Sequence, residues 1–519
     1  MIAIDFLRDR TSLPALAAAI GLALLSSSAA AQPKGEIVVA SSLFNQHNDP
    51  TVLVSMANHL SGDFIFDGLL NLGPEGKYPA LATGWKISED GKQVDFDLRR
   101  GVKFHNGDPF TAEDVKFSYE KILDSASTHS YRKPFVDSIE RIEVVDPHKV
   151  RMVLKAPWPG FFSSIRYGVQ PIVPKAYYEK VGAKGFQEKP VGTGPFKLVE
   201  VKAGEWNKYE ANAEYWGGAP AVKTVTQRVV KEAFTLYAMV EKGEVDIATG
   251  LSGALLDRVA SNSKLRIFTS RYSGTSAMYF NKVKFPESRD KNVRLAVGHA
   301  LNRADIARKL LNGVCEPAAS IFTPGTFGYL AGLNQVAYDP AKAKKMLADA
   351  GVKPGQEISY TLQTDSFPSL SNAPQVLEAL AGNLEAVGFK VVREPYDSTA
   401  WLAMMRGRKQ PAVFYGPSSM PDDGGETLAT WFVRTSMWSA GNIDVPRYNA
   451  IFDEQLKAAD LKQREKLLQE FARLEDENRE VIPLFWCHTA FVAGPRIKEW
   501  QPALGSGYNL NLKSVRLAQ

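Results

Sequence analysis

The residue types that most often carry catalysis or bind metals are present, but their spacing favours neither chemistry. The chain has no GxSxG nucleophile motif and no HExxH zinc motif. Asp422 and Asp423 could form a catalytic carboxylate pair, but the flanking Pro421 and Gly424-Gly425 favour a solvated turn. No metal-ligand spacing within one helix or hairpin occurs among the seven histidines, which are His47, His59, His105, His129, His148, His299 and His488. The sequence therefore predicts a protein that is not an enzyme and needs no cofactor.

The glycines of Pro190–Phe196, PVGTGPF, invite comparison with a phosphate-binding loop. They lack the GxGxxG pattern, and no Lys-Ser or Lys-Thr pair follows them. Glycine also allows close approach of two backbones, so we expect a tight, buried crossover strand here. ATP hydrolysis by this chain is therefore not expected.

The amino terminus predicts export. Arg8 and Arg10 precede an uncharged apolar run, Leu13–Leu25, and Ala29–Ala31 provides a small-residue cleavage site. The run is shorter than the roughly 20 residues that span a bilayer, which disfavours the alternative of a membrane anchor. No cysteine follows it for lipid attachment. We expect residues 1–31 to be a signal peptide and the mature protein to be soluble in the periplasm of a Gram-negative bacterium.

Length and charge bound the remainder of the chain. Roughly 490 residues exceed what a single hydrophobic core supports, so two or three domains are expected. The net charge of +5 is modest, and no basic run is interleaved with aromatic residues, so nucleic acid is not an expected partner. The only two cysteines, Cys315 and Cys487, could form a disulfide in an oxidising compartment. Their distance is unknown from sequence, and two buried free thiols are the favoured interpretation.

The segment Leu81–Leu123 predicts a strand, a turn and a helix. Apolar and polar residues alternate over 94–98, which is typical of a half-buried strand. A turn at 105–108 follows, and Thr111 can cap a helix with Asp114 three residues later. The expected buried face of that helix consists of Val115, Ser118, Tyr119 and Ile122.

The same segment resembles the signature of the family 5 extracellular solute-binding proteins, the peptide, nickel and opine receptors that feed ABC importers. About fifteen positions match in order, among them Trp85, Asp90-Gly91, Phe96, Asn106-Gly107 and Thr111–Val115. Further matches follow along the chain: Phe64–Leu70, PVGTGPF at Pro190–Phe196, Asn212–Pro220 with its YWGG, GEVDI at Gly243–Ile247, Asn292–Arg303 and Tyr338–Ala343.

This resemblance implies an α/β periplasmic binding protein of type II, cluster C. Two hinged α/β lobes would enclose the ligand in a cleft, with an extra domain beside them. The implied divisions are the signal peptide 1–31, lobe I from 32–70 with 190–269 and 485–519, extra domain II at 71–189, and lobe III at 270–484.

The resemblance also implies where ligand binds. Trp401 matches a tryptophan that stacks on ligand in the family, and Arg408 lies where oligopeptide receptors place a cleft arginine. Peptide receptors pair the ligand's free amine with an aspartate in a following loop, and here that position falls on Met420. Asp423 aligns with a later family aspartate, whose proline has become Gly424, and Asp422 or Asp423 could take the amine-binding role if the loop is shifted. The full set of expected ligand-binding residues is Trp401, Arg408, Tyr415, Ser418, Ser419, Met420 and Asp423, with Phe44, Asn45 and His47 from lobe I.

The implied function is a monomeric periplasmic substrate-binding component of an ABC importer. It would capture a peptide-like or small polar solute and deliver it to an inner-membrane permease. Three alternatives stay open: a nickel or metal-chelate receptor of the same family, a secreted hydrolase, and a receptor that docks to a signalling sensor instead of a permease. The loss of the amine-binding aspartate makes blocked peptides, opines or sugars more plausible as ligands than ordinary dipeptides.

Overall fold

The computed structural model describes residues 33–41, 48–51, 62, 64–73, 76–129, 132–158, 161, 165, 171–251, 253–364, 372–417, 423–434, 443–458, 461–502 and 510–518. Residues 32–519 form one compact unit, and the predicted signal peptide, 1–31, lies outside the described residues. Among the helices that are described, none combines the length and apolar character needed to cross a membrane.

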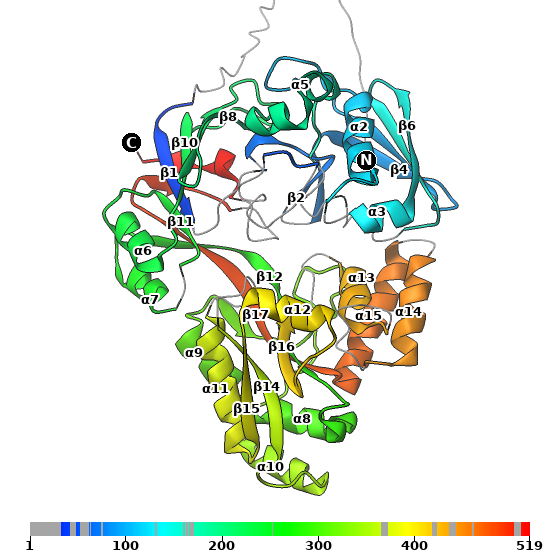
Figure 1. The fold of residues 1–519 in the computed structure, drawn as a ribbon, viewed down its shortest axis with the longest axis vertical. Coiled ribbons are helices and arrows are strands. Elements are labelled where there is room, and N and C mark those ends of the chain that lie inside the picture. The colour runs from blue at the N-terminus through cyan, green and yellow to red at the C-terminus, as the bar shows by residue number, and fades with distance from the viewer. Residues whose placement is uncertain are drawn as a thin grey trace, which may run out of the picture. The chain divides into compact units, whose positions relative to one another are not determined.

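A mixed sheet of eleven strands organises the molecule (Figure 1). Its order is β15-β14-β16-β12-β17-β11-β1-β10-β9-β8, and β13 pairs with β17 beside this path. In chain order these strands are β1 (Glu36–Ser41), β8 (Phe196–Lys202), β9 (Trp206–Ala211), β10 (Thr224–Val229), β11 (Ile247–Thr249), β12 (Arg266–Phe280), β13 (Cys315–Pro317), β14 (Glu357–Gln363), β15 (Lys390–Tyr396), β16 (Val413–Pro417) and β17 (Val481–Ala493).

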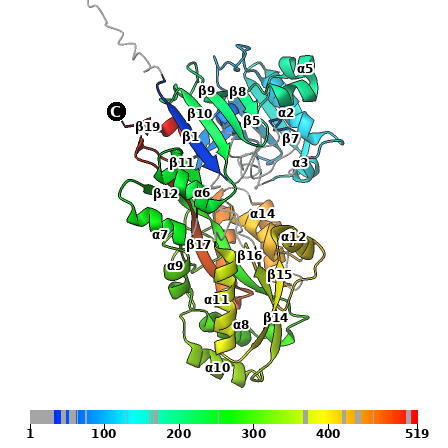
Figure 2. The ribbon, with the colours of Figure 1, turned by 60° about the vertical axis from the view of Figure 1, so that its left-hand side comes forward.

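The two long central strands, β12 and β17, run antiparallel side by side (Figure 2). Their pairing is interrupted by register shifts between Thr269 and Ala277, and Gly274 there has a φ of 135°. Both predicted boundaries of lobe III, at 269/270 and 484/485, fall inside these strands. The division into lobes stays a prediction. If it holds, β12 and β17 run without a break from lobe I into lobe III.

A separate four-stranded sheet, β4-β5-β7-β6, contains β4 and β5 from the segment that carried the family signature and two strands that follow it in the chain. The predicted strand is confirmed as β5, with Val94, Phe96 and Leu98 buried. The predicted helix is confirmed as α2, with Thr111 and Asp114 forming the capping box and the expected face buried. The elements of this region are β4 (Ala82–Ile87), β5 (Gln93–Leu98), α2 (Ala112–Leu123), α3 (Arg132–Ser138), β6 (Ile139–Asp146), β7 (Lys149–Leu154) and α5 (Lys175–Glu188).

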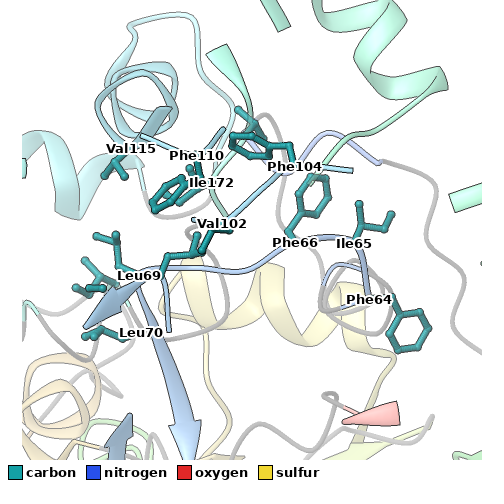
Figure 3. Packing of buried hydrophobic residues seen from close by; sticks show 14 of the residues in the cluster. Phe64, Ile65, Phe66, Leu69, Leu70, Val102, Phe104, Phe110, Val115 and Ile172 are labelled. Atoms are coloured by element: carbon teal, nitrogen blue, oxygen red, sulfur yellow. The ribbon is translucent and has the colours of Figure 1, made fainter. Parts of the chain in front are cut away.

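Apolar side chains of Phe64–Leu70 join this region to the large sheet. They pack in one cluster with Val102, Phe104, Phe110, Val115 and Ile172 (Figure 3). The hairpin of β2 (Leu70–Gly73) and β3 (Gly76–Pro79) continues from this segment, and the chain ends near a small pair of strands, β18 (Ile497–Glu499) and β19 (Arg516–Leu517).

Helices cover both faces of the large sheet. Apolar residues of α8, α9, α10 and α11 pack on one face of β14 and β16, whereas those of α12, α14 and α15 pack with Phe414 on the other. Their bounds are α6 (Ala233–Glu241), α7 (Ala254–Ser261), α8 (Lys291–Ala300), α9 (Arg303–Leu310), α10 (Pro340–Asp349), α11 (Ala373–Ala386), α12 (Ser398–Arg406), α13 (Gly424–Thr427), α14 (Pro446–Leu456) and α15 (Leu461–Asn478), with a π-turn, η2, at Leu428–Phe432.

The favoured interpretation of the cysteines as two free thiols was wrong. Cys315 and Cys487 are joined in a disulfide. The antiparallel pairing of β13 and β17 places the two residues directly opposite each other, with their Cα atoms 4.0 Å apart. Sequence could not supply that register, because it depends on how two distant segments pair.

Candidate functional site

The direction in which the chain adds strands reverses at β14. This reversal identifies the neighbouring edge of the sheet as a candidate ligand-binding site. β14 pairs in parallel with both β15 and β16, so the chain moves out to β15 through α11 and returns past β14 to β16 through α12. The helices α11 and α12 lie on opposite faces. Open α/β sheets bind ligands outside the carboxyl ends of their strands at such a switch point. Here those ends are Gln363, Tyr396 and Pro417.

Trp401 lies at this edge, on α12, and is only 3% exposed. Its indole Nε1 donates to the carbonyl oxygen of Tyr415, 3.2 Å away. Its ring packs in the cluster that contains Phe414, and lies against the backbone at Gly416, where an added Cβ would be 3.6 Å from the ring. The tryptophan thus couples α12 to β16. Its predicted stacking on ligand stays a prediction.

Tyr415 is close to Trp401 through its backbone only. Its side chain is 1% exposed and packs with the cluster on the opposite face of β16, because successive residues of a strand point to opposite faces. The structure therefore brings the two predicted aromatic residues to one strand end but directs their rings to different cores.

Arg408 is exposed and lies just after the end of α12. Its φ of 52° is left-handed, a conformation that commonly ends a helix. This position agrees with the arginine being a helix-end residue as well as with a contact to ligand.

Asp423 is buried and ion-paired. Its two carboxylate oxygens accept hydrogen bonds from Arg464 of α15 at 2.7 and 2.8 Å, and both side chains are 3% exposed. Oδ1 also accepts from the backbone amide of Gly425, which caps α13. The charge that the sequence offered to a ligand amine is thus already matched by a guanidinium.

The other six predicted ligand residues, Phe44, Asn45, His47, Ser418, Ser419 and Met420, lie outside the described residues. Ser41 ends β1, which runs parallel to β10 and β11, so Phe44 and its neighbours follow another carboxyl strand end in the chain.

Sequence reasoning missed a polar group at the same edge. Strand β15 ends at Tyr396, whose hydroxyl donates to Glu394 at 2.7 Å. The parallel register places Thr361 beside Glu394 and Gln363 beside Tyr396, and both β14 side chains are fully buried. The signal available in the sequence was the alternation of polar Thr361 and Gln363 with apolar Leu362 at the end of β14.

A second buried carboxylate organises the family motifs. Asp67 accepts hydrogen bonds from Tyr215 at 2.9 Å, Trp216 Nε1 at 2.8 Å and Thr193 at 2.9 Å. Burial raises the pKa of Asp67 above its usual value, and these hydrogen bonds oppose the rise. Three motifs recognised separately in the sequence therefore meet at one side chain, which is a structural junction.

The glycines of PVGTGPF serve the same junction. A Cβ on Gly194 would lie 2.5 Å from the carbonyl carbon of Ile65, and Gly194 donates its amide to Ile65 at 2.9 Å. Burial lowers the pKa of the adjacent His105 to about 4, so its ring is neutral at pH 7. The expected burial and tight packing of this segment are confirmed, but residues 190–195 do not form the expected strand, since β8 begins only at Phe196.

The described residues contain no group of three or more His, Cys, Asp or Glu side chains that could hold a metal ion. This finding covers none of the omitted segments, which include His47.

Comparisons with known proteins address the whole chain. Residues 77–439 match the family described as bacterial extracellular solute-binding proteins, family 5 Middle. The chain is 27% identical over 463 residues to di/tripeptide-binding protein 2 of Pseudomonas aeruginosa, covering 84% of this chain and 85% of that protein. It is 29% identical over 473 residues to the glutathione-binding protein GsiB of Salmonella choleraesuis, covering 90% of each.

The fold is similar to a solved structure as well. The ABC transporter substrate-binding protein CtaP from Listeria monocytogenes superposes with a TM-score of 0.83 at 22% identity, covering 94% of this chain and 100% of that one. The expected α/β periplasmic binding protein fold is confirmed.

Proposed function

Because the chain belongs to the family 5 bacterial extracellular solute-binding proteins, we propose that it is the substrate-binding component of an ABC importer. It captures a peptide-like or small polar solute and delivers it to a membrane permease. The family match over residues 77–439 carries this proposal. The secreted hydrolase considered as an alternative does not fit a family of solute-binding receptors.

The proposal includes cellular context. Export through residues 1–31 would place a soluble, monomeric receptor in the periplasm, where an inner-membrane permease is its partner. The receptor binds and releases its solute unchanged, without a cofactor. The disulfide between Cys315 and Cys487 supports an oxidising compartment.

The proposed solute site lies at the carboxyl ends of β14, β15 and β16. Polar residues end β14 and β15, and Trp401 contacts the neighbouring β16. This edge therefore combines the aromatic and hydrogen-bonding groups that small-molecule sites use. The similar di/tripeptide- and glutathione-binding proteins favour a short peptide or a peptide derivative as the solute.

A thermal-shift panel on the natively purified mature protein tests this function. The probes are Ala-Ala, Ala-Ala-Ala, N-acetyl-Ala-Ala, reduced glutathione, an opine and Ni²⁺ with histidine. A ligand at 100 times its Kd stabilises the folded state by about 2.7 kcal/mol, which is readily visible as a higher Tm.

Mass spectrometry completes the test by identifying solute released from the native protein and by following the probes over time. We expect one peptide-like probe to raise Tm and to remain chemically intact. A shift with Ni²⁺ and histidine alone would favour the metal-chelate receptor, whereas turnover of a probe would contradict a receptor role.

A further inference from the structure

Asp423, the N-cap residue of α13, and the glycine that follows it are held by contacts from two other segments, α15 and the chain at Phe327. The carboxylate of Asp423 pairs with Arg464 of α15, and its Oδ1 accepts the amide of Gly425 at 2.8 Å. Gly424 donates its amide to the carbonyl of Phe327 at 2.9 Å, and Phe327 and Asp423 form a parallel β-bridge.

Arg464 has a geometry that suits this task. Nη1 and Nη2 donate to the two oxygens of Asp423, Nε donates to Gln455 of α14 at 2.8 Å, and the guanidinium lies 5.2 Å from the ring centroid of Phe327. A planar fork can make the two parallel hydrogen bonds and keep a third donor for another element. A lysine, with one nitrogen, keeps the charge but cannot reproduce this arrangement.

The two glycines after Asp423 allow close packing, Gly425 against Arg464 and Gly424 against Phe322. A Cβ at Gly425 would collide with the guanidinium of Arg464, and a Cβ at Gly424 would lie 2.5 Å from the ring of Phe322. The family pattern has proline at position 424, which would remove the amide that donates to Phe327. The departure from that pattern is therefore matched by a specific backbone hydrogen bond.

The start of α13, at Asp423 and Gly424, connects to the candidate site through a chain of ring contacts. From α13 the chain continues into η2, where the ring of Trp431 lies 6.0 Å from that of Tyr279. Tyr279 stacks on Phe414 of β16 at 5.2 Å, and β16 is the strand that Trp401 contacts.

We propose that Arg464 is a positioning residue of the solute site. By holding Asp423, it fixes the start of α13 and, through the ring contacts of Trp431 with Tyr279 and of Tyr279 with Phe414, the position of β16 at the candidate site, and this sets the affinity for solute. Asp423 then serves as the partner of Arg464 and not as the counter-charge of a ligand. This inference rests on the proposed function and assigns a role to a residue outside the predicted ligand set.

Arg464→Lys tests the proposal, with Arg447→Lys as the matched control. Arg447 also makes a bidentate pair between α14 and α15, with Glu470 at 2.7 and 2.9 Å, but it does not contact Asp423. The first measurement is hydrogen exchange of the full-length mature protein without ligand. We expect the amides of Gly424, Gly425 and Thr427 to exchange at least tenfold faster in Arg464→Lys and at the wild-type rate in Arg447→Lys.

The second measurement is the Kd for reduced glutathione by calorimetry, at a temperature where all three proteins are fully folded. We expect Arg464→Lys to weaken binding about tenfold or more and Arg447→Lys to bind as the wild type does. Unchanged affinity in Arg464→Lys would overturn the positioning role even if its Tm is lower. If the wild type binds neither glutathione nor any other probe, the proposed function fails. Hydrogen exchange then tests separately whether Arg464 holds the start of α13: unchanged rates at 424–427 refute this, and faster rates in Arg464→Lys support it.

Discussion

Two buried aspartates, Asp67 and Asp423, show two ways of keeping a carboxylate in a protein interior. Asp67 is held by three neutral donors, whereas Asp423 is held by a charged one. Burying a carboxylate costs free energy, which neutral hydrogen bonds offset in part and a well-oriented guanidinium can offset more fully. Asp67 lies where the sequence matches its family motifs, and Asp423 lies where the match breaks down.

The difference has a functional meaning. The neutral junction at Asp67 joins three backbone segments that only need to stay together. The ion pair at Asp423 fixes the chain beside a candidate solute site, where orientation matters as well as cohesion. Removing one partner of a buried ion pair is more costly than losing a neutral hydrogen bond, so the two aspartates should respond differently to the same substitution.

Asp423→Asn should produce the largest effect. It leaves the guanidinium of Arg464 buried without a counter-charge, which we expect to lower the free energy of unfolding by about 3–5 kcal/mol. Urea denaturation at pH 7 measures this change. Glu470→Gln is the control, because its pair with Arg447 is partly exposed and should contribute about 1 kcal/mol or less. Equal losses in the two variants would contradict the distinction.

Glu475→Gln tests what determines how stability depends on pH near a buried carboxylate: the type of its hydrogen-bond donors, or its position on α15. Glu475 lies on α15, as Arg464 does, but it accepts from neutral groups: Tyr448 at 2.7 Å and the amide of Val481 at 3.0 Å. Burial, and then the nearby Glu480, raise the pKa of Glu475 to about 8, with Arg479 opposing the rise.

A raised folded-state pKa gives stability that is complete below the unfolded pKa, near 4.5, and is lost as pH rises through about 8. The loss from this group approaches about 1.4 kcal/mol per pH unit within that window. Unfolding free energies measured from pH 5 to 9 should therefore fall less steeply in Glu475→Gln than in the wild type. Parallel curves would show that Glu475 titrates normally.

How much the sequence could predict also differs between the two regions. The strand at 94–98 and the capping box of Thr111 and Asp114 were predicted correctly, because both depend on neighbouring residues. The motifs around Asp67 were recognised one by one in the sequence. That they meet at one side chain was not predicted, because Trp216 is 149 positions from Asp67. Such contacts are set by tertiary packing.

The candidate site was predicted less completely for the same reason. Trp401 was recognised from the resemblance, yet the partner of Asp423 was not, because Arg464 belongs to a helix rich in charged residues, most of which are exposed or half-buried. Nothing in its local pattern separates the one buried arginine that pairs with Asp423 from its solvated neighbours.

Gly194→Ala tests whether the Asp67 junction depends on backbone proximity. The new methyl group would press on the backbone of Ile65, and overpacking of this kind typically costs about 1–3 kcal/mol. Gly382→Ala in α11 is the control: no atom lies within 4 Å of its added Cβ, and alanine favours helix there. Denaturant midpoints should move in opposite directions, and a neutral result at Gly194 would refute the close approach.

Asp67→Asn should have the smallest effect. An asparagine can turn its oxygen to Trp216 and Thr193 and its amide to Tyr215, whose hydroxyl can rotate to accept. All partners then stay satisfied, so we expect a loss of about 1 kcal/mol at most, against several for Asp423→Asn.

The pH dependence of Asp67→Asn gives the comparison its sharpest form. Burial raises the pKa of Asp67, with Lys513 and the three donors opposing, so the wild-type contribution is complete below the ordinary value of 3.8 and declines as pH rises through the folded-state pKa. The amide does not titrate, so the cost of Asp67→Asn should shrink between pH 4 and pH 7. A cost that grows with pH would mean that folding lowers the pKa of Asp67 instead of raising it, and the distinction from Asp423 would disappear.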